Sequence, residues 1–476
     1  MAEGQITILD AMADENVFGH AFRDAESWRA WTAFLAALFG LPLDDEAQAI
    51  FRDCTGRSEP PAEGVGEAWL VIGRRGGKSF VLATIAVFLA CFRDWRPYLA
   101  PGELGTVMVI AADRRQARVI LRYVRGLLNA SAMLKAQIKN NSAETIELAN
   151  SVCIEVHTAS WRTTRGYTVV AGLCDELAFW RADDSANPDT EILNAIRPAM
   201  ATIPGALLLC ASSPYARRGA LYRAWQKHFG KDDDKALVWQ ASTRTMNPKI
   251  PERIISEAFE DDPISAAAEY GAQFRSDVES FVSLAVVEAC TIVGRHELPR
   301  DVRTRYTAFV DPSGGTSDSM TLAIAHLEGG ERAVLDCVRE VRAPFSPESV
   351  VKEFVETLDS YGCHRVTGDR YAGEWPREAF RRRGITYEAS ERSKSDLYGG
   401  LLPMLNSGRV NLLDDQRLRQ QLINLERRTS RGGRDLIDHP PGAHDDLANA
   451  VAGALVSALN EKSKRGVMRV TTVRAY

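Results

Sequence analysis

The sequence lacks the features that mark membrane, secreted and disulfide-rich proteins. Its eight cysteines are scattered without a CxxC pair, which is typical of a protein from a reducing compartment. The longest apolar run, Phe80 to Phe92, falls short of the roughly 20 residues that a membrane-spanning helix needs. The first residues, MAEGQITILDAMADE, are acidic and lack the basic start and apolar centre of a secretory signal. We therefore expect a soluble cytosolic protein that does not enter a membrane.

An excess of basic charge is also absent, because the formal net charge is −5. This charge does not indicate nucleic-acid binding. It does not exclude it either, since a local basic stripe is enough to follow a phosphate backbone. No internal repeat or low-complexity tract occurs. A chain of 476 residues is long for a single core and suits two or three domains.

The first half of the chain alternates apolar strands with helical patterns, which is typical of an α/β domain with a mostly parallel sheet. Strands are expected at EAWLVI, GTVMVIAA, TVVAGLCDE and ALLLCASS. A polar, proline-punctuated stretch then predicts a helical connector, and a second α/β pattern follows it. The expected boundaries are 1–245 for the first domain, 246–295 for the connector, 296–460 for the second domain and 461–476 for a flexible basic tail.

The stretch WLVIGRRGGKSF in the first domain has the parts of a phosphate-binding loop. Backbone N–H groups at the start of a helix cradle phosphates, Lys78 would reach the β- and γ-oxygens, and Ser79 would help to hold Mg²⁺. Ile72 stands where the strict pattern has a glycine, but three later glycines still permit close approach of the backbone: Gly73, Gly76 and Gly77. From this stretch alone, a strand–helix turn with a surface lysine is an equal alternative.

A second motif favours a nucleotide site. The apolar strand TVVAGLCDE ends in Asp175 and Glu176. An NTPase needs one carboxylate near its Mg²⁺ ion and a neighbouring one to polarise the attacking water. Strands also often end in acidic turn or cap residues, but such a pair is less expected by chance after a Gly-Lys-Ser loop. The two motifs together predict an ATPase that uses ATP and Mg²⁺.

The order of these motifs resembles the large terminase subunit of tailed bacteriophages, the ATPase and nuclease of a viral DNA-packaging motor. The resemblance runs from about Trp28 to Leu459. Phosphate loops of this family commonly carry an early arginine, and Arg74 or Arg75 occupies that position here. The fold that the resemblance implies is α/β throughout: an N-terminal P-loop NTPase domain and a C-terminal RNase H-like nuclease domain.

The resemblance also implies roles for residues around the nucleotide. Ser212 and Ser213, in ASSP, match a motif that couples the ATP state to movement, although a serine-rich strand end is the simpler alternative. Arg165 stands where an arginine finger is expected and would stabilise charge on the γ-phosphate. Arg162 is its rival, and a solvated arginine is an equal alternative. Trp28 and Trp31 match a helix beside the adenine, but aromatic residues at this spacing are more often core.

For the second half, the resemblance implies a nuclease in which carboxylates hold two Mg²⁺ or Mn²⁺ ions. Asp311 ends the strand TAFVD, and Asp369 ends the strand VTGD. The helix start HDDLANA carries Asp445 and Asp446, of which Asp446 is favoured as the metal ligand, with Asp445 close behind. Each of these aspartates, taken singly, is better explained as a turn or cap residue.

Two further residues lie near these aspartates in the sequence. Asp318 would contribute to a second metal position, whereas His444 fits a helix entry better than a ligand. Basic segments would give sequence-independent contacts to DNA phosphates, although a charge run is usually a solvated face. These segments are Arg377 with Arg381, Arg382 and Arg383, and Arg427 with Arg428, Arg431 and Arg434.

The function that the resemblance implies is that of a packaging motor. ATP hydrolysis would drive double-stranded DNA into a procapsid, and the endonuclease would cut the concatemer. The expected partners are a portal protein, a small terminase subunit and further copies in a ring of five on the procapsid, with a monomer in isolation left open. The expected location is the host-cell cytoplasm rather than the mature virion.

Two other interpretations stay open. One is an ATP-dependent translocase or helicase that remodels nucleic acid without cutting it. The other is a non-enzymatic assembly protein with decayed sites. The intact set Lys78, Ser79, Asp175 and Glu176 argues against decay.

Overall fold

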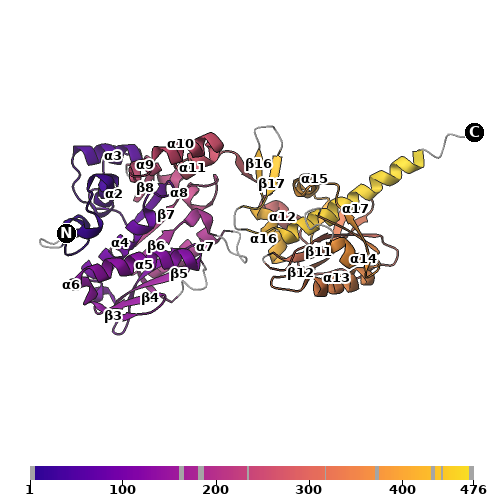
Figure 1. Ribbon diagram of the computed structural model, residues 1–476, viewed down its shortest axis with the longest axis horizontal. Coiled ribbons are helices and arrows are strands. Elements are labelled where there is room, and N and C mark those ends of the chain that lie inside the picture. Colours follow the sequence, from indigo (N-terminus) through magenta and orange to yellow (C-terminus); the bar gives the residue numbers. More distant parts are fainter. Residues whose placement is uncertain are drawn as a thin grey trace, which may run out of the picture. The chain divides into compact units, whose positions relative to one another are not determined.

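The chain forms two compact units, residues 1–276 and 277–476 (Figure 1). The computed structural model describes residues 6–159, 166–180, 187–232, 235–316, 318–369, 375–429, 435–440 and 443–470. The boundary between the units lies inside the segment 246–295, which the sequence assigns to a connector. The helices α10 (Glu252–Asp261) and α11 (Pro263–Glu269) of this segment belong to the first unit, and α12 (Leu284–Cys290) belongs to the second.

The first unit is built on an eight-stranded sheet in the order β3-β4-β5-β2-β6-β7-β1-β8. The strands from β5 to β8 in this order pair in parallel, and antiparallel β4 and β3 extend one edge. The mostly parallel sheet predicted for this half is therefore confirmed. Its strands are β1 (Glu67–Ile72), β2 (Gly105–Ala111), β3 (Ile138–Asn141), β4 (Thr145–Leu148), β5 (Val152–Thr158), β6 (Thr168–Asp175), β7 (Leu207–Ser212) and β8 (Ala236–Ala241).

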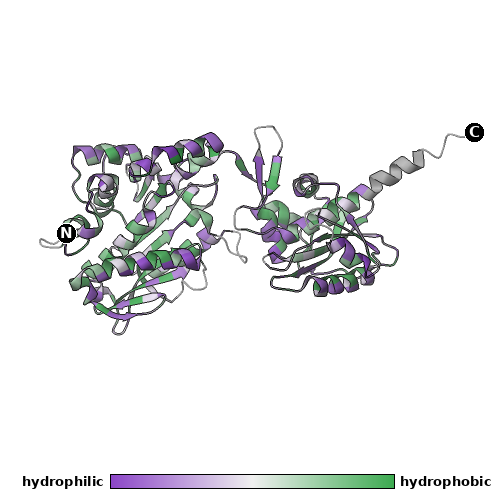
Figure 2. Ribbon diagram, viewed as in Figure 1, coloured by the Kyte–Doolittle hydropathy of each residue, from purple (hydrophilic) through white to green (hydrophobic). Residues whose placement is uncertain are grey.

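Both faces of this sheet are buried beneath helices. In β1, Leu70 and Ile72 belong to one hydrophobic core, whereas Trp69 and Val71 belong to another, because successive side chains of a strand point to opposite faces. Figure 2 shows mostly hydrophobic residues along these strands and alternating bands on the covering helices.

Most helices of the first unit pack in the first of these cores. They are α1 (Ile8–Ala13), α2 (Arg29–Phe39), α3 (Asp45–Thr55), α4 (Lys78–Phe92), α5 (Arg114–Ala130), α6 (Ala132–Lys135) and α9 (Thr243–Met246). The helices α7 (Pro188–Met200) and α8 (Gly219–His228) cover the other face. None of the helices in the described part of the chain has both the length and the apolar composition needed to cross a bilayer.

The second unit has a six-stranded sheet in the order β14-β13-β10-β11-β12-β15. Antiparallel β10, β11 and β12 form a meander, and β13 and β14 continue from β10 in parallel. This arrangement is the RNase H-like sheet expected from the resemblance. The strands are β10 (Tyr306–Asp311), β11 (Met320–Glu328), β12 (Arg332–Val341), β13 (Arg365–Gly368), β14 (Thr386–Ala389) and β15 (Val410–Asn411). A small sheet, separate from it, contains β9 (Val278–Ser280), β16 (Glu426–Thr429) and β17 (Asp435–Asp438).

Helices cover both faces of the six-stranded sheet. One face packs against α12, α15 (Lys394–Asn406), α16 (Gln416–Asn424) and α17 (Asp446–Val470), and the other against α13 (Pro347–Tyr361) and α14 (Trp375–Arg381). Helix α17 continues to Val470, so it enters the segment 461–476 that the sequence assigns to a flexible basic tail.

Gly453 of α17 gives a test of how closely this helix packs on the sheet. A Cβ at Gly453 would lie closer than van der Waals contact to the ring of Phe309, which is 1% exposed and has no space to move into. We expect Gly453→Ala to destabilise the second unit by about 1–3 kcal/mol, measured by hydrogen exchange of the α17 and β10 amides.

The matched control is Gly399→Ala in α15, where a Cβ would meet nothing within 4 Å. This substitution should stabilise its helix by about 0.5–1 kcal/mol, because alanine is the better helix former. Equal effects of the two substitutions would show that α17 does not depend on contact at Gly453.

Candidate nucleotide and metal sites

The loop between β1 and α4 is one residue shorter than the strict phosphate-loop pattern. Ile72 is the last residue of β1 and is fully buried in the core, so the loop begins at Gly73. A Cβ at Gly73 would collide with Thr243 of α9 and with the carbonyl oxygen of Tyr270. Gly77 has a φ of 100°, which favours glycine. The position where the strict pattern has its first glycine therefore belongs to the strand and is filled by Ile72. The remaining glycines allow the loop to pack against α9.

Lys78 is enclosed by this loop and by the neighbouring strand end. Its Nζ atom donates to the carbonyl oxygen of Ile72 at 3.1 Å and to Ser213 Oγ at 2.9 Å. It also lies 3.3 Å from Glu176 Oε1, and the lysine side chain is 4% exposed. The ammonium group thus has anionic and polar partners where a phosphate-binding lysine is expected, and oxygens of a ligand can exchange for them.

Asp175 ends β6 directly beside Ser79. Ser79 Oγ donates to Asp175 Oδ2 at 2.8 Å, and the other carboxylate oxygen, Oδ1, is buried without a hydrogen-bond partner. Burial, followed by repulsion from Glu176, raises the pKa of Asp175 to about 7. A hydroxyl, a carboxylate and an orphaned carboxylate oxygen are the oxygen donors that Mg²⁺ prefers, so these residues fit a magnesium ion.

Glu176 is held by the serines at the end of β7. Its Oε2 atom accepts hydrogen bonds from Ser212 Oγ and from the backbone N–H of Ser213, both at 3.2 Å. Glu176 has a left-handed backbone with a φ of 50°, an unusual conformation for a residue other than glycine. The serine motif and the acidic pair predicted from the sequence therefore meet in space, with Lys78 between them.

The arginines predicted around the nucleotide differ in position. Arg74 makes an ion pair with Glu269 of α11 at 3.2 Å, and the side chain of Arg75 is exposed. Arg162 and Arg165, the two candidates for an arginine finger, lie outside the described residues.

Trp31 has a role that the sequence did not reveal. It is fully buried, so it does not flank a base, and its indole N–H donates to the carbonyl oxygen of Gly76 at 2.9 Å. Trp28 is partly exposed and lies against Phe22 and Phe80. Trp31 therefore holds the phosphate loop at Gly76, and Trp28 lies beside Gly77.

The second unit brings the predicted aspartates into one cleft. Asp311 ends β10, Asp369 follows β13 on the neighbouring strand, and Asp446 begins α17. The cleft is lined by these three residues together with Asp318 and Asp445. Parallel strands β10 and β13 end at the same edge of the sheet, so residues distant in sequence meet there.

Asn449 is a buried residue of this cleft that the sequence analysis missed. Its Nδ2 atom donates to Asp311 Oδ2 at 2.9 Å, and its Oδ1 atom is buried without a partner. Asn449 lies one helical turn after Asp446, a spacing that places both on one face of α17. That spacing is the signal that would have found it.

The carboxylates of the cleft are difficult to ionise together. Burial raises the pKa of Asp311 to about 8, with repulsion from Asp446 adding to the shift. Burial, followed by repulsion from Asp445, raises the pKa of Asp446 to about 6. Asp446 also accepts a hydrogen bond from the backbone N–H of Ser319 at 3.2 Å. Crowded carboxylates and an orphaned amide oxygen fit divalent cations, which would offset this repulsion.

Asp445 and Asp446 have different surroundings. Asp445 is buried and accepts a hydrogen bond from Tyr398 at 2.8 Å, and Lys394 Nζ lies 3.1 Å from its carboxylate. Lys394 also lies 2.5 Å from Asp438. The group Asp438, His439 and Asp445 has a spacing that could hold a metal ion, but the lysine ammonium already supplies a cation there.

The outer residues predicted for the cleft are more exposed. Asp318 lies 3.4 Å from His444, and both side chains are about half exposed. Helix α14, which carries Arg377 and Arg381, packs on the face of the sheet opposite α17. Arg427 and Arg428 pair with Asp435 and Glu426 at 2.5 and 3.0 Å. Arg431 and Arg434 lie outside the described residues.

Comparison with known proteins supports the resemblance. Residues 69–188, which contain the phosphate loop and the acidic pair, match the family model of the N-terminal region of the T4likevirus-type terminase large subunit. The comparison with curated proteins gives no match.

Solved structures with some similarity include three phage terminases. The large terminase of bacteriophage HK97 is 17% identical, with 88% of this chain and 95% of that chain covered and a TM-score of 0.37. The large terminase of a thermophilic bacteriophage is 11% identical, with 91% and 99% covered and a TM-score of 0.39. The large terminase nuclease of the thermophilic phage G20c is 18% identical, with 36% and 95% covered and a TM-score of 0.32. Similarities of this size are too weak to support a functional argument.

The hydrogen bond from Trp31 to the phosphate loop can be tested through nucleotide binding. Trp31→Phe keeps the aromatic ring but leaves the carbonyl oxygen of Gly76 without its donor. Because a buried hydrogen bond contributes about 1 kcal/mol, we expect affinity for ATP to fall about fivefold in a fluorescence titration. The control is Trp95→Phe, which removes a similar bond to Leu89 at the far end of α4. Equal losses in both variants would mean that the effect is one of general stability.

The raised pKa of Asp311 predicts a pH-dependent affinity for metal ions. Below the pKa of about 8 this carboxyl is protonated, and a divalent cation must displace the proton to bind. We expect Mn²⁺ affinity to rise from pH 6 to pH 8, approaching tenfold per unit, and then to level. Calorimetry in buffers of different ionisation enthalpy should show that protons are released on Mn²⁺ binding. The control variant Asp311→Asn measures the binding heat and proton release that come from other groups of the chain. Affinity that is flat over this range would contradict the burial of Asp311.

The same shift affects folding of the metal-free protein. Because the pKa of Asp311 is higher in the folded protein than its unfolded value of about 3.9, the folded state binds more protons over the interval between them. The contribution of Asp311 to stability is therefore complete at low pH and is lost as the pH rises toward 8.

Proposed function

We infer that this chain, whose residues 69–188 match the terminase large-subunit family, is an ATP-driven DNA-packaging motor that also cuts DNA. The observation that carries this proposal is the presence of two separate acidic centres. One lies at the carboxyl edge of the first sheet around Asp175, and the other lies at the carboxyl edge of the second sheet around Asp311. A translocase without nuclease activity has no need of the second centre.

In the proposed ATPase, the phosphates lie against the loop and the start of α4. Lys78 exchanges its contacts with Glu176 and Ser213 for phosphate oxygens. Ser79 and Asp175 would hold a Mg²⁺ ion, which would supply positive charge to neutralise the phosphates. Glu176, no longer paired with Lys78, is then free to orient the attacking water.

In the proposed nuclease, Asp311, Asp369 and Asp446 would hold divalent cations. Bound there, two such ions would supply a nucleophilic water and charge stabilisation for the leaving oxygen of a phosphodiester. Asn449 keeps the Asp311 carboxylate in position through its amide. Asp445 is braced by Lys394 and Tyr398 and contributes to the position of α17 rather than to the cations.

The proposal includes partners that the terminase resemblance implies. These are double-stranded DNA, a portal protein, a small terminase subunit and further copies of the chain in a ring on a procapsid. The proposed location is the cytoplasm of the host cell.

The two centres should be separable by mutation. Lys78→Ala should lower the rate of ATP hydrolysis by about 100-fold or more, because it removes a preorganised charge from the phosphates, but should leave metal-dependent cutting of supercoiled plasmid unchanged. Asp369→Ala should abolish cutting and retain ATP hydrolysis. Both activities are measured on the same preparations, with Mg²⁺ or Mn²⁺ and with EDTA.

The controls are Lys227→Ala on α8 and Asp359→Ala on α13, which change exposed residues outside both sites. If the wild-type protein hydrolyses ATP but does not cut DNA with either Mg²⁺ or Mn²⁺, the nuclease assignment fails. A translocase without nuclease activity then becomes the better account. If Lys78→Ala also loses cutting while folded, the two sites are not independent.

A further inference from the structure

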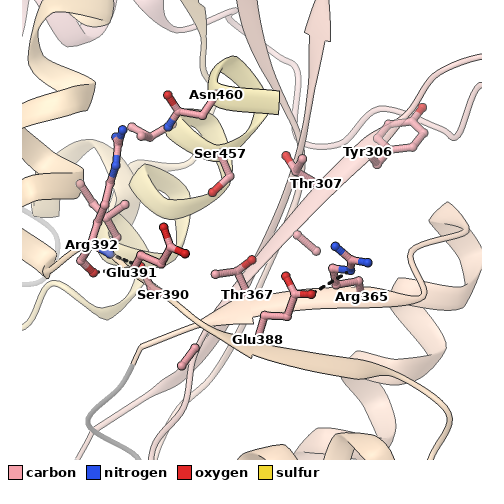
Figure 3. Close-up of a pocket in the computed structure, with 14 residues that line it drawn as sticks. Tyr306, Thr307, Arg365, Thr367, Glu388, Ser390, Glu391, Arg392, Ser457 and Asn460 are labelled. Carbon is pink, nitrogen blue, oxygen red and sulfur yellow. Dashed lines mark hydrogen bonds and ion pairs between the residues drawn. The ribbon is translucent and has the colours of Figure 1, made fainter. Parts of the chain in front are cut away.

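A second pocket lies on the same face of the six-stranded sheet as the acidic cleft. Its volume is about 510 Å³, and it is bounded by β10, β13, β14, the segment after β14 and the later turns of α17 (Figure 3). Thr307 and Asp311 are four residues apart on β10, so their side chains point to one face. Thr367 pairs with Phe309 and shares that face. The pocket and the cleft are therefore two parts of one surface.

The distance between the two is short on the scale of a nucleic acid. Four residues of a β-strand span about 13 Å, which separates Thr307 in the pocket from Asp311 in the cleft. One strand of duplex DNA carries a phosphate for each rise of about 3.4 Å along the axis. A strand whose scissile phosphate lies at the aspartates therefore reaches the pocket within about four nucleotides.

Two residues, Glu391 and Arg392, line both the pocket and the cleft. Their segment is held firmly. Ser390 Oγ donates to the carbonyl oxygen of Arg392 at 2.9 Å, and the backbone N–H of Ser390 donates to the carbonyl oxygen of Gly368 at 2.8 Å. A capping box at Ser393 then starts α15. Arg392 thus projects from a fixed point at the boundary between the two spaces.

The lining of the pocket is polar and has unused hydrogen-bonding groups. Within the described residues, the side chains of Thr367, Ser457 and Asn460 make no hydrogen bond, and Arg392 makes no ion pair. By contrast, Arg365 is paired with Glu388 at 3.2 Å.

Figure 3 shows Arg392 extending along the pocket toward Asn460, with the carboxylate of Glu391 directed into it. Neutral donors around one unpaired arginine are typical of contacts to a sugar–phosphate backbone. An apolar ligand would leave these groups desolvated without partners.

We propose that this pocket binds the sugar–phosphate backbone of the DNA strand beside the phosphate being cut, with Arg392 as the cation that contacts it. The proposal rests on the nuclease function proposed above and adds a subsite to it. Arg392 is a binding residue here and takes no part in the chemistry at the aspartates. Glu391 opposes it, because its carboxylate faces the same phosphates.

The test compares three full-length variants in cutting of linear duplex DNA with Mn²⁺ over a range of salt concentrations. Arg392→Gln should raise KM about tenfold, because a hydrogen bond to a charged group is lost, and should change kcat less than about twofold. The slope of log KM against log salt should fall by about 0.9, the value for one phosphate contact. Glu391→Gln should lower KM, since it removes a repulsive charge. Arg332→Gln, an exposed arginine on β12 outside the pocket, should match the wild type.

An unchanged KM and salt slope in Arg392→Gln would overturn the proposal, as would an equal effect of Arg332→Gln. A loss of kcat at unchanged KM would also overturn it, because it would place Arg392 in the chemistry instead. If the wild type does not cut DNA with any divalent metal, the proposed nuclease function fails, but the pocket proposal is still open to test. In that case, the affinity of the same variants for a fluorescent duplex is measured in EDTA over the same salt range. A fall of about 0.9 in the salt slope for Arg392→Gln would support DNA binding by the pocket, and an unchanged slope would overturn it.

Discussion

The crowding of carboxylates at the carboxyl edge of each central sheet is the constraint that the functional architecture depends on. Asp175 and Glu176 lie at the carboxyl edge of the first sheet, and Asp311 and Asp446 lie at the carboxyl edge of the second. Burial makes the negative charges of Asp175 and Asp311 costly. The two units offset this cost differently. The first supplies a cation of its own in Lys78. The second supplies an amide and a backbone N–H, so it leaves more of the compensation to cations that bind.

The same constraint explains why neighbouring aspartates differ in role. Asp445 precedes α17 and Asp446 is its first residue, and the two carboxylates have different partners. Lys394 neutralises Asp445 together with Asp438, and Tyr398 fixes its orientation. Asp446 is left facing the cleft. The lysine therefore separates a carboxylate that braces the helix from one that faces the proposed metal site.

Prediction from sequence succeeded where a local pattern has a physical cause. Alternating and continuous apolar runs predicted both sheets, and the glycine-rich loop with its lysine was visible because its chemistry is local. The roles of Trp31, Lys394 and Tyr398 were not predictable, because each depends on a partner far away in the chain. Asn449 was within reach, since it follows Asp446 by one helical turn. Composition marked the segment between the units but not the residue at which the first unit ends, because that point depends on contacts between residues far apart in the chain. Long-range hydrogen bonds are among these contacts.

Those hydrogen bonds tie the phosphate loop to the segment that leads out of the first unit. The backbone N–H of Arg74 donates to the carbonyl oxygen of Glu269, the hydroxyl of Thr243 donates to the carbonyl oxygen of Arg74, and the amide of Asn247 donates to the carbonyl oxygen of Arg75. Loop backbone and segment therefore form one hydrogen-bonded layer. A loop that adjusts to a phosphate must either break these bonds or carry the segment with it.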